Sequence, residues 1–123
     1  MTCTIGYFEG TDPLLLTKLY VKGHGTMPCS NHWDHHGKLV SLLKKGEIKA
    51  LVGYTHKVLP PTHKERPTPF NLLHTCKTHE IPVFLIAPEG CEEECEELLG
   101  TDTLEFVHLV TPETVEEELD KVL

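Results

Sequence analysis

The chain has 123 residues and a formal net charge of −8, and 39% of its residues are hydrophobic while 24% are charged. Such a composition excludes an intrinsically disordered chain, and the length suits one domain around one hydrophobic core. No apolar run approaches the roughly 18 residues of a membrane-spanning helix, and the N-terminus lacks a secretory-signal pattern, so we expect a cytoplasmic protein without membrane contact.

The first third of the sequence predicts one strand and two helices. Residues 2–8 form a β-rich run, and Thr11 or Asp12, followed by a proline, marks the start of the first helix. Residues 23–30 are rich in turn-forming residues and predict a loop. A second helix is expected over residues 32–45, where apolar residues recur at helical spacing.

The rest of the sequence alternates predicted strands with predicted helices. Strands are expected in three apolar segments, residues 48–54, 81–87 and 104–110. Helices are expected over residues 70–79, 91–99 and 112–123, the last capped by Thr111. Between them lies a proline-rich segment, residues 59–69, which cannot form regular structure and is a candidate lid or partner contact.

This order of elements predicts an α/β fold. Because helices intervene between successive strands, the strands must be parallel, and strands that are apolar on both faces need helices on both sides. We therefore predict a three-layer α/β/α sandwich, Rossmann-like or flavodoxin-like, with about four parallel strands. The whole chain, residues 1–123, is expected to form this single α/β domain.

Ligands of open parallel sheets bind outside the carboxyl ends of the strands, and this rule selects candidate residues. Those that follow the predicted strands 2–8 and 48–54 are Glu9, Thr11, Tyr54, Thr55, His56 and Lys57. A histidine beside a lysine suits proton transfer next to a charge that neutralises a phosphate or carboxylate. His56 and Lys57 are therefore candidate catalytic residues, and the others are candidate ligand-binding residues.

Residues 24–38, called here the His-rich loop, carry the densest group of potential ligands. If Asn31 caps the predicted second helix, His32 and His36 lie four residues apart on one helical face. Such a pair binds a divalent metal such as zinc readily, and both histidines are also candidate catalytic residues. The further candidate metal ligands are His24, Cys29 and Asp34.

The same loop allows other interpretations. The N-terminus of the predicted helix attracts anions, so the loop is also a candidate site for a metal-free anionic ligand, with Trp33 as a wall and His35 at the flank. The histidines are equally compatible with solvent-exposed or capping roles. Cys29 is a candidate nucleophile because it lies in a loop near positive charge.

Charge is distributed unevenly along the chain. Residues 1–66 carry nine Lys or Arg and five Asp or Glu, whereas residues 67–123 carry two and fourteen. A basic, His-rich half indicates a local preference for anions, but the chain lacks the aromatic and basic pattern of a nucleic-acid-binding protein. It also contains no P-loop, no GxGxxG and no GxSxG pattern. The five cysteines form no CxxC pairs, which excludes a zinc ribbon and argues against a disulfide framework.

Together these features predict a small protein that binds a small anionic molecule, with or without a metal ion, at the carboxyl edge of its sheet. Whether it is an enzyme stays open at this stage. The alternative is a non-catalytic assembly or regulatory module that uses the His-rich loop and the proline-rich segment as a protein interface. A homo-oligomer is expected in either case, because a small doubly wound domain has too few helices to cover its sheet fully.

Overall fold

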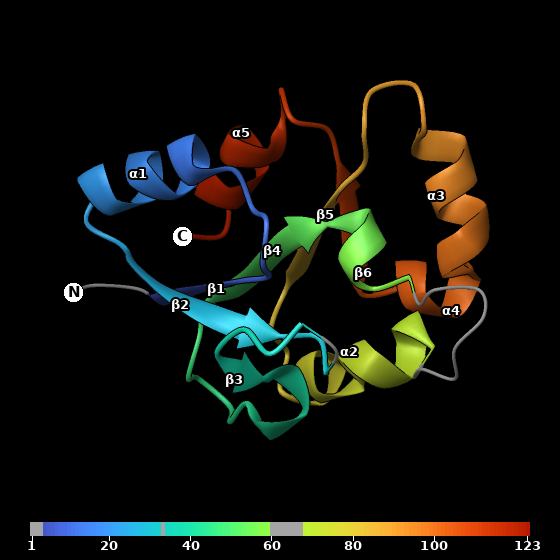
Figure 1. The fold of residues 1–123 in the computed structure, drawn as a ribbon, viewed down its shortest axis with the longest axis horizontal. Helices are drawn as coiled ribbons and strands as arrows, with labels where there is room; N and C mark the ends of the chain where they lie inside the picture. The colour runs from blue at the N-terminus through green and yellow to red at the C-terminus, as the bar shows by residue number, and fades with distance from the viewer. Residues whose placement is uncertain (1–3, 33, 60–67) are drawn as a thin grey trace.

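The computed structural model describes residues 4–32, 34–59 and 68–123, and it contains one sheet of six parallel strands. The strands are β1 (Thr4–Tyr7), β2 (Gly25–Ser30), β3 (Lys38–Leu39), β4 (Ala50–Tyr54), β5 (Val83–Ile86) and β6 (Val107–Val110). Their order across the sheet is β3-β2-β1-β4-β5-β6, and every neighbouring pair is parallel. All six strands therefore end at the same edge, called here the carboxyl edge (Figure 1).

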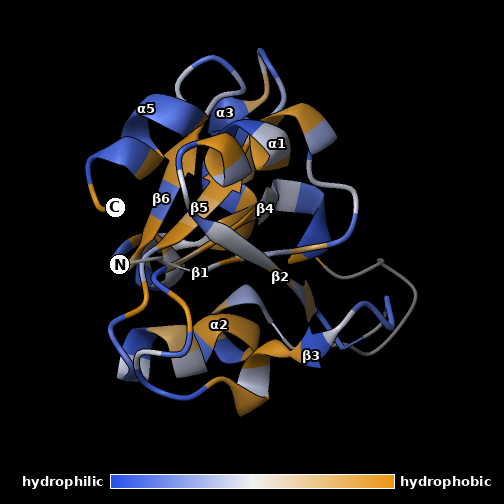
Figure 2. Ribbon diagram, turned by 90° about the vertical axis from the view of Figure 1, so that its left-hand side faces the viewer, coloured by the Kyte–Doolittle hydropathy of each residue, from blue (hydrophilic) through white to orange (hydrophobic). Residues whose placement is uncertain are grey.

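Helical elements flank this sheet on both faces. Helices α1 (Pro13–Val21) and α5 (Val115–Asp120) lie on one face, and α2 (Pro69–Thr78) and the 3-10 turn η1 (Val40–Leu42) on the other. Helices α3 (Glu92–Leu99) and α4 (Thr101–Leu104) precede β6. Two buried apolar clusters result, and hydrophobic residues concentrate in the sheet between the helical layers (Figure 2). The cluster beneath α1 and α5 includes Ile5, Leu15, Leu19, Phe84 and Leu119, and the opposite cluster includes Phe8, Val40, Leu51, Leu72 and Leu85.

The predicted start signal of the first expected helix is confirmed, and the structure adds a cap of the same kind at the third. The Asp12 side chain accepts a hydrogen bond from Leu14 N at 2.9 Å, and a proline opens α1. Thr68 caps α2 in the same way, because its hydroxyl accepts from Asn71 N at 3.2 Å. Each side chain satisfies one of the backbone donors that an α-helix leaves unpaired at its beginning.

The α/β class and the parallel sheet are confirmed, but the expected number of about four strands is wrong. The two additional strands lie in the first third of the chain: β2 occupies most of the expected loop 23–30, and β3 falls inside the expected helix 32–45. That helix does not form. It is replaced by an irregular loop, the two residues of β3 and the turn η1.

Backbone geometry explains why no helix follows Asn31. His32 and His35 have φ angles of +79° and +48°, outside the right-handed helical region. Gly37 has φ +80°, and a Cβ built on it would lie 2.2 Å from the carbonyl oxygen of Pro28. Glycine therefore lets the chain turn tightly against β2 and pair Cys29 with the beginning of β3.

Two smaller differences concern the end of the chain. The expected strand 104–110 begins only at Val107, because α4 and a turn occupy the preceding residues. The expected helix 112–123 is present as the shorter helix α5, and its N-cap is Thr114 rather than Thr111. No helix within the described residues is long and apolar enough to span a membrane.

Candidate functional site at the carboxyl edge

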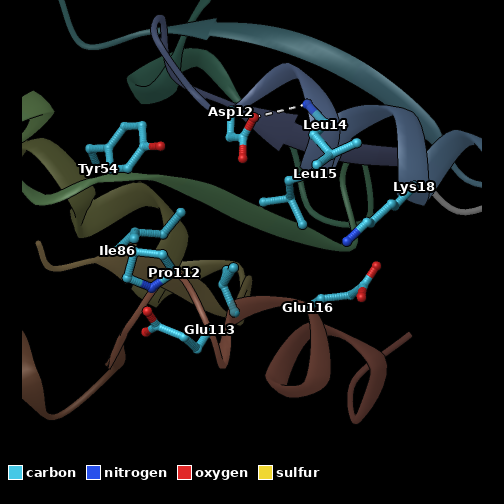
Figure 3. Close-up of a pocket in the computed structure, with 10 residues that line it drawn as sticks. Asp12, Leu14, Leu15, Lys18, Tyr54, Ile86, Pro112, Glu113 and Glu116 are labelled. Carbon is cyan, nitrogen blue, oxygen red and sulfur yellow. Dashed lines mark hydrogen bonds between the residues drawn. The ribbon is translucent and has the colours of Figure 1, made fainter. Parts of the chain in front are cut away.

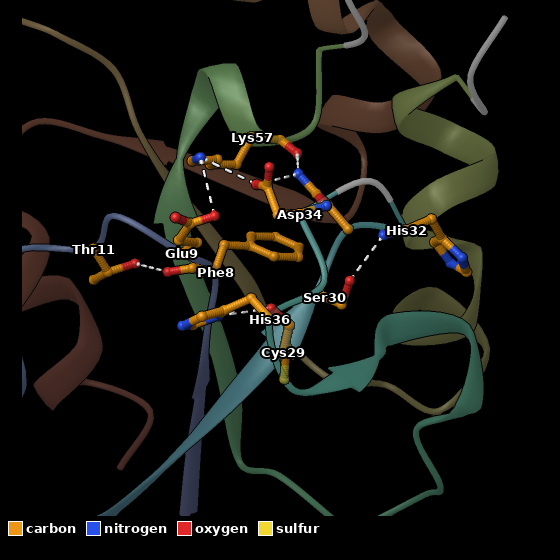
Figure 4. A network of polar contacts seen from close by, with 10 residues as sticks. Phe8, Glu9, Thr11, Cys29, Ser30, His32, Asp34, His36 and Lys57 are labelled. Carbon is orange, nitrogen blue, oxygen red and sulfur yellow. Dashed lines mark hydrogen bonds and ion pairs between the residues drawn. The ribbon is translucent and has the colours of Figure 1, made fainter.

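The order of the strands places a topological switch point between β1 and β4. From β1 the chain adds β2 and β3 on one side, and then adds β4, β5 and β6 on the other. In open parallel sheets the crevice at such a switch point is where ligands bind. Three segments meet here at the carboxyl edge: the loop 8–12 after β1, the loop 31–37 after β2 and the 3-10 turn η2 (Thr55–Lys57) after β4 (Figure 4).

A small ion-pair cluster joins these three segments. The Lys57 Nζ lies 3.1 Å from an Asp34 carboxylate oxygen and 3.9 Å from a Glu9 carboxylate oxygen. The Lys57 and Asp34 side chains are each 18% exposed, whereas Glu9 is 50% exposed. The Lys57–Asp34 pair is therefore the shielded and shorter contact, and the Glu9 contact is the loose one. Figure 4 shows Lys57 above both carboxylates.

Asn31 connects the segments of this cluster through hydrogen bonds. Its side chain is fully buried, and its amide nitrogen donates to the Lys57 carbonyl oxygen at 2.7 Å and to Asp34 Oδ2 at 3.0 Å. Its amide oxygen accepts from Asp34 N at 3.0 Å. Asn31 thus makes the hydrogen bond of a helix cap with Asp34, three residues later, although no helix follows it. The buried amide fixes the backbone of the loop after β2 to η2.

The loop after β1 approaches the cluster from the other side. The buried Thr11 hydroxyl donates to the Phe8 carbonyl oxygen at 2.7 Å, so it stabilises the loop itself. A Cβ built on Gly10 would lie 3.5 Å from Lys57 Cε, which places this loop against the lysine stem. The N–H groups of Glu9 and Gly10 donate to no acceptor within the described part of the chain. Unpaired backbone donors and a lysine are thus present together at the switch point.

The end of β4 supplies the remaining predicted residues. Thr55 is buried and donates to the Ile86 carbonyl oxygen at 2.9 Å, so it ties β4 to β5. The Tyr54 and His56 rings stack with centroids 5.9 Å apart. Desolvation lowers the pKa of His56 below its usual 6.5, the Lys57 charge lowers it further, and Asp34 acts in the opposite direction. The surroundings of His56 therefore favour the neutral form of its imidazole.

The metal site predicted in the His-rich loop is not assembled. Figure 4 shows the His32 and His36 side chains pointing in different directions, and His36 Nδ1 lies 3.3 Å from the Cys29 carbonyl oxygen. The backbone N–H of His32 donates to Ser30 Oγ at 3.2 Å. His24 precedes β2 at the opposite edge of the sheet, roughly 16 Å from Cys29 at about 3.3 Å per strand residue. Among the described residues no three His, Cys, Asp or Glu side chains are grouped to hold a metal ion. The predicted ligands, as the described part of the chain places them, therefore do not surround a zinc ion.

The thiol of Cys29 belongs to the hydrophobic core. Cys29 is fully buried, and a Cβ on Gly6 would lie 2.9 Å from its sulfur. Burial raises the pKa of the Cys29 thiol to about 11. A hydrogen bond with the backbone of Tyr7 lowers the pKa, but only partly offsets the effect of burial. A neutral, enclosed thiol is poorly suited to nucleophilic attack or metal binding.

Alkylation tests this assignment. We expect Cys29 in the native protein to resist iodoacetamide at pH 8, because only about one thiol in a thousand is ionised there and the sulfur is enclosed. Peptide mass spectrometry measures the modified fraction of each cysteine. Cys91, which is half-buried, is the internal control and should react, and urea should expose Cys29. Rapid modification of native Cys29 would contradict its placement in the core.

A cavity of about 400 Å³, which the sequence did not predict, lies next to the cluster, between α1 and α5 (Figure 3). Its lining residues are Asp12, Leu14, Leu15, Lys18, Tyr54, Ile86, Pro112, Glu113, Val115 and Glu116. Only Tyr54 among them was a predicted site residue. The cavity depends on the approach of two helices about 100 residues apart in the sequence, and no local pattern signals that approach. Its three carboxylates and one ammonium group do not suit a small anion.

The structure thus divides the predicted site residues. Glu9, Lys57 and Asn31 are brought together with Asp34, and Tyr54, Thr55, His56 and Thr11 lie in the segments beside them. His24, Cys29, His32 and His36 do not converge, His35 is exposed, and Trp33 lies outside the described residues, as does most of the proline-rich segment. Comparison with known proteins gives no match, either to a family model or to a curated sequence.

Proposed function

We propose that the chain binds a small anionic molecule at the switch point between β1 and β4, with Lys57 as the positive charge that recognises it. The observation that carries the proposal is the position of this lysine: it is 18% exposed and lies where a Rossmann-like three-layer sheet receives its ligand. The unpaired N–H groups of Glu9 and Gly10 supply further donors for a phosphate or carboxylate group.

The carboxylates around Lys57 do not block an incoming anion equally. Asp34 is shielded, and Asn31 holds it at 3.0 Å, so it stays with the ammonium group. Glu9 lies 3.9 Å from Lys57 Nζ and is half exposed, and such a contact contributes only about 0–1 kcal/mol. The ligand would therefore take the place of Glu9 while Asp34 keeps Lys57 in position.

His56 gives this site its capacity for proton transfer. Its lowered pKa favours the neutral ring, which is the form that accepts a proton from a bound acid. An anion bound at Lys57 would offset the lysine charge and so favour the protonated imidazole. In this proposal His56 is the general base, and His32 and His36 take no part because they point elsewhere.

Titration with inorganic phosphate, followed by amide NMR shifts, tests the proposal. We expect a Kd on the order of 1 mM, with the largest shifts at residues 9–11 and 55–57. Lys57→Gln should weaken binding about tenfold or more, because a charged hydrogen-bond donor is lost, and Lys57→Arg should restore most of it. Glu9→Gln should strengthen binding several-fold, since it removes the competing carboxylate.

Lys121→Gln is the matched control for the phosphate titration. Lys121 also pairs with a glutamate, Glu118 at 3.0 Å, but it lies at the end of α5 and is 61% exposed. Its replacement should leave the phosphate affinity unchanged. Equal phosphate affinities for wild type and Lys57→Gln, with both folded by circular dichroism, would overturn the proposal.

A further inference from the structure

The cavity between α1 and α5 has the size and walls of a binding site. Its volume of about 400 Å³ lies within the usual range for small-molecule pockets. Leu15, Ile86 and Val115 form an apolar floor, and all three are buried. Leu14 stands at the wall with 59% of its surface exposed, so apolar surface is available to a ligand. The cavity lies at the carboxyl edge beside the switch point.

The charged groups of the cavity favour a cation. Asp12, Glu113 and Glu116 line it against a single cation, Lys18 (Figure 3). One Asp12 oxygen accepts from Leu14 N, and Glu116 lies 3.5 Å from Lys22, but Glu113 makes no ion pair within the described residues. An amine placed at Glu113 would form an ion pair with the carboxylate without displacing an existing partner.

Ion pairs connect α1 and α5 beside the cavity. Lys22 near the end of α1 lies 2.9 Å from Asp120 and 3.5 Å from Glu116 on α5. These ion pairs join the end of α1 to both ends of α5, and Glu116, which lies in the first turn of α5, also lines the cavity. Tyr54 borders the opening, and its hydroxyl points toward the cavity. The site therefore combines an apolar floor, one hydroxyl and a surplus of negative charge.

We infer that this cavity binds a small molecule made of an apolar body and a positively charged amine, at a site separate from the phosphate site at Lys57. The apolar body would contact Leu15, Ile86 and Val115, and the amine would lie near Glu113. Because the two sites attract ligands of opposite charge, each can be tested without the other.

A pair of ligands with the same apolar body and opposite charge provides the sharpest test. The probes are 3-phenylpropylamine and 3-phenylpropionate, titrated into the full chain and followed by amide NMR shifts. We expect the amine to shift residues of α1, α5 and Tyr54 and to bind at least about fivefold more tightly than the carboxylate. The two affinities are compared at these residues only, because the carboxylate probe also suits the phosphate site at Lys57. Equal binding of the two probes there, or amine shifts confined to other regions, would overturn the inference.

Variants locate the site independently of the probes. Glu113→Gln should weaken amine binding about threefold or more, and Lys18→Gln should strengthen it, because each changes the charge at the cavity. Glu117→Gln is the matched control, since this exposed glutamate lies on α5 outside the lining and should have no effect. Lys57→Gln should leave amine binding intact. An unchanged affinity in the Glu113 variant would contradict the assigned amine position.

Discussion

Replacing Phe8 with alanine is expected to lower the free energy of unfolding by about 3–5 kcal/mol, because the side chain is fully buried and leaves a cavity. The Phe8 ring fills the space above Gly53, where a Cβ would lie 2.6 Å from ring carbon Cδ2. Its backbone also joins the core to the site: Phe8 N donates to Val52 O at 3.1 Å, and Phe8 O accepts from Thr11. Urea denaturation measures the change.

Phe70→Ala is the control for this variant, because it makes the same chemical change in a partly buried ring that contacts Phe106. It should cost clearly less than Phe8→Ala. We also expect Phe8→Ala to weaken phosphate binding, since the loop that carries Glu9 and Thr11 begins at Phe8 and is hydrogen-bonded to its carbonyl oxygen. A loss of stability no larger than in the Phe70 variant would show that Phe8 does not anchor the carboxyl edge.

The parts of the fold with strong local signals could be predicted from the sequence. The segments around β4 and β5 are apolar on both faces, as buried parallel strands require. Asp12 with a proline, and Thr68 with a proline, mark the starts of α1 and α2. In these places burial and capping act over a few residues, so neighbouring sequence contains the necessary information.

The region between α1 and β4 could not be predicted in the same way. β2 contains Pro28, and a proline argues against a strand inside a sheet. The proline is tolerated here because β3 pairs only with the two residues that follow it, Cys29 and Ser30. The apolar residues over 39–43 do recur at helical spacing, but the short turn η1 and its neighbours bury only Val40 and Leu43 fully and leave Leu42 exposed. Positive φ angles at His32 and His35 have no clear signature in the residue type.

The same distinction explains the outcome for the candidate site. The position of Lys57 and Glu9 at one edge follows from parallel strands alone, so the sequence was sufficient to predict it. The expected approach of His32 and His36 depended on a helix, and it was lost with that helix. The contact of Asp34 with Lys57 depends on the path of the loop after β2, which only the three-dimensional arrangement specifies.

The strongest connection between stability and the site is expected at Asn31. Asn31→Ala should lower the free energy of unfolding by about 2–4 kcal/mol, because it removes hydrogen bonds to Asp34 and to the Lys57 carbonyl in a fully buried position. Asn31→Asp should also destabilise the protein, since it places a second carboxylate against Asp34 and removes the amide donor. Asn71→Ala, an exposed change on α2, serves as the control and should stay within about 0.5 kcal/mol.

Phosphate titration of the Asn31 variants then separates a positioning role from a purely structural one. At a temperature where Asn31→Ala is still folded, we expect its phosphate affinity to fall several-fold, because neither Asp34 nor η2 is held in place for Lys57. Phe70→Ala, which is also destabilised but lies away from the carboxyl edge, should keep the wild-type affinity. If Asn31→Ala unfolds like the wild type, or binds phosphate equally well while folded, the buried amide does not organise the site and the loops after β2 and β4 are positioned by other contacts.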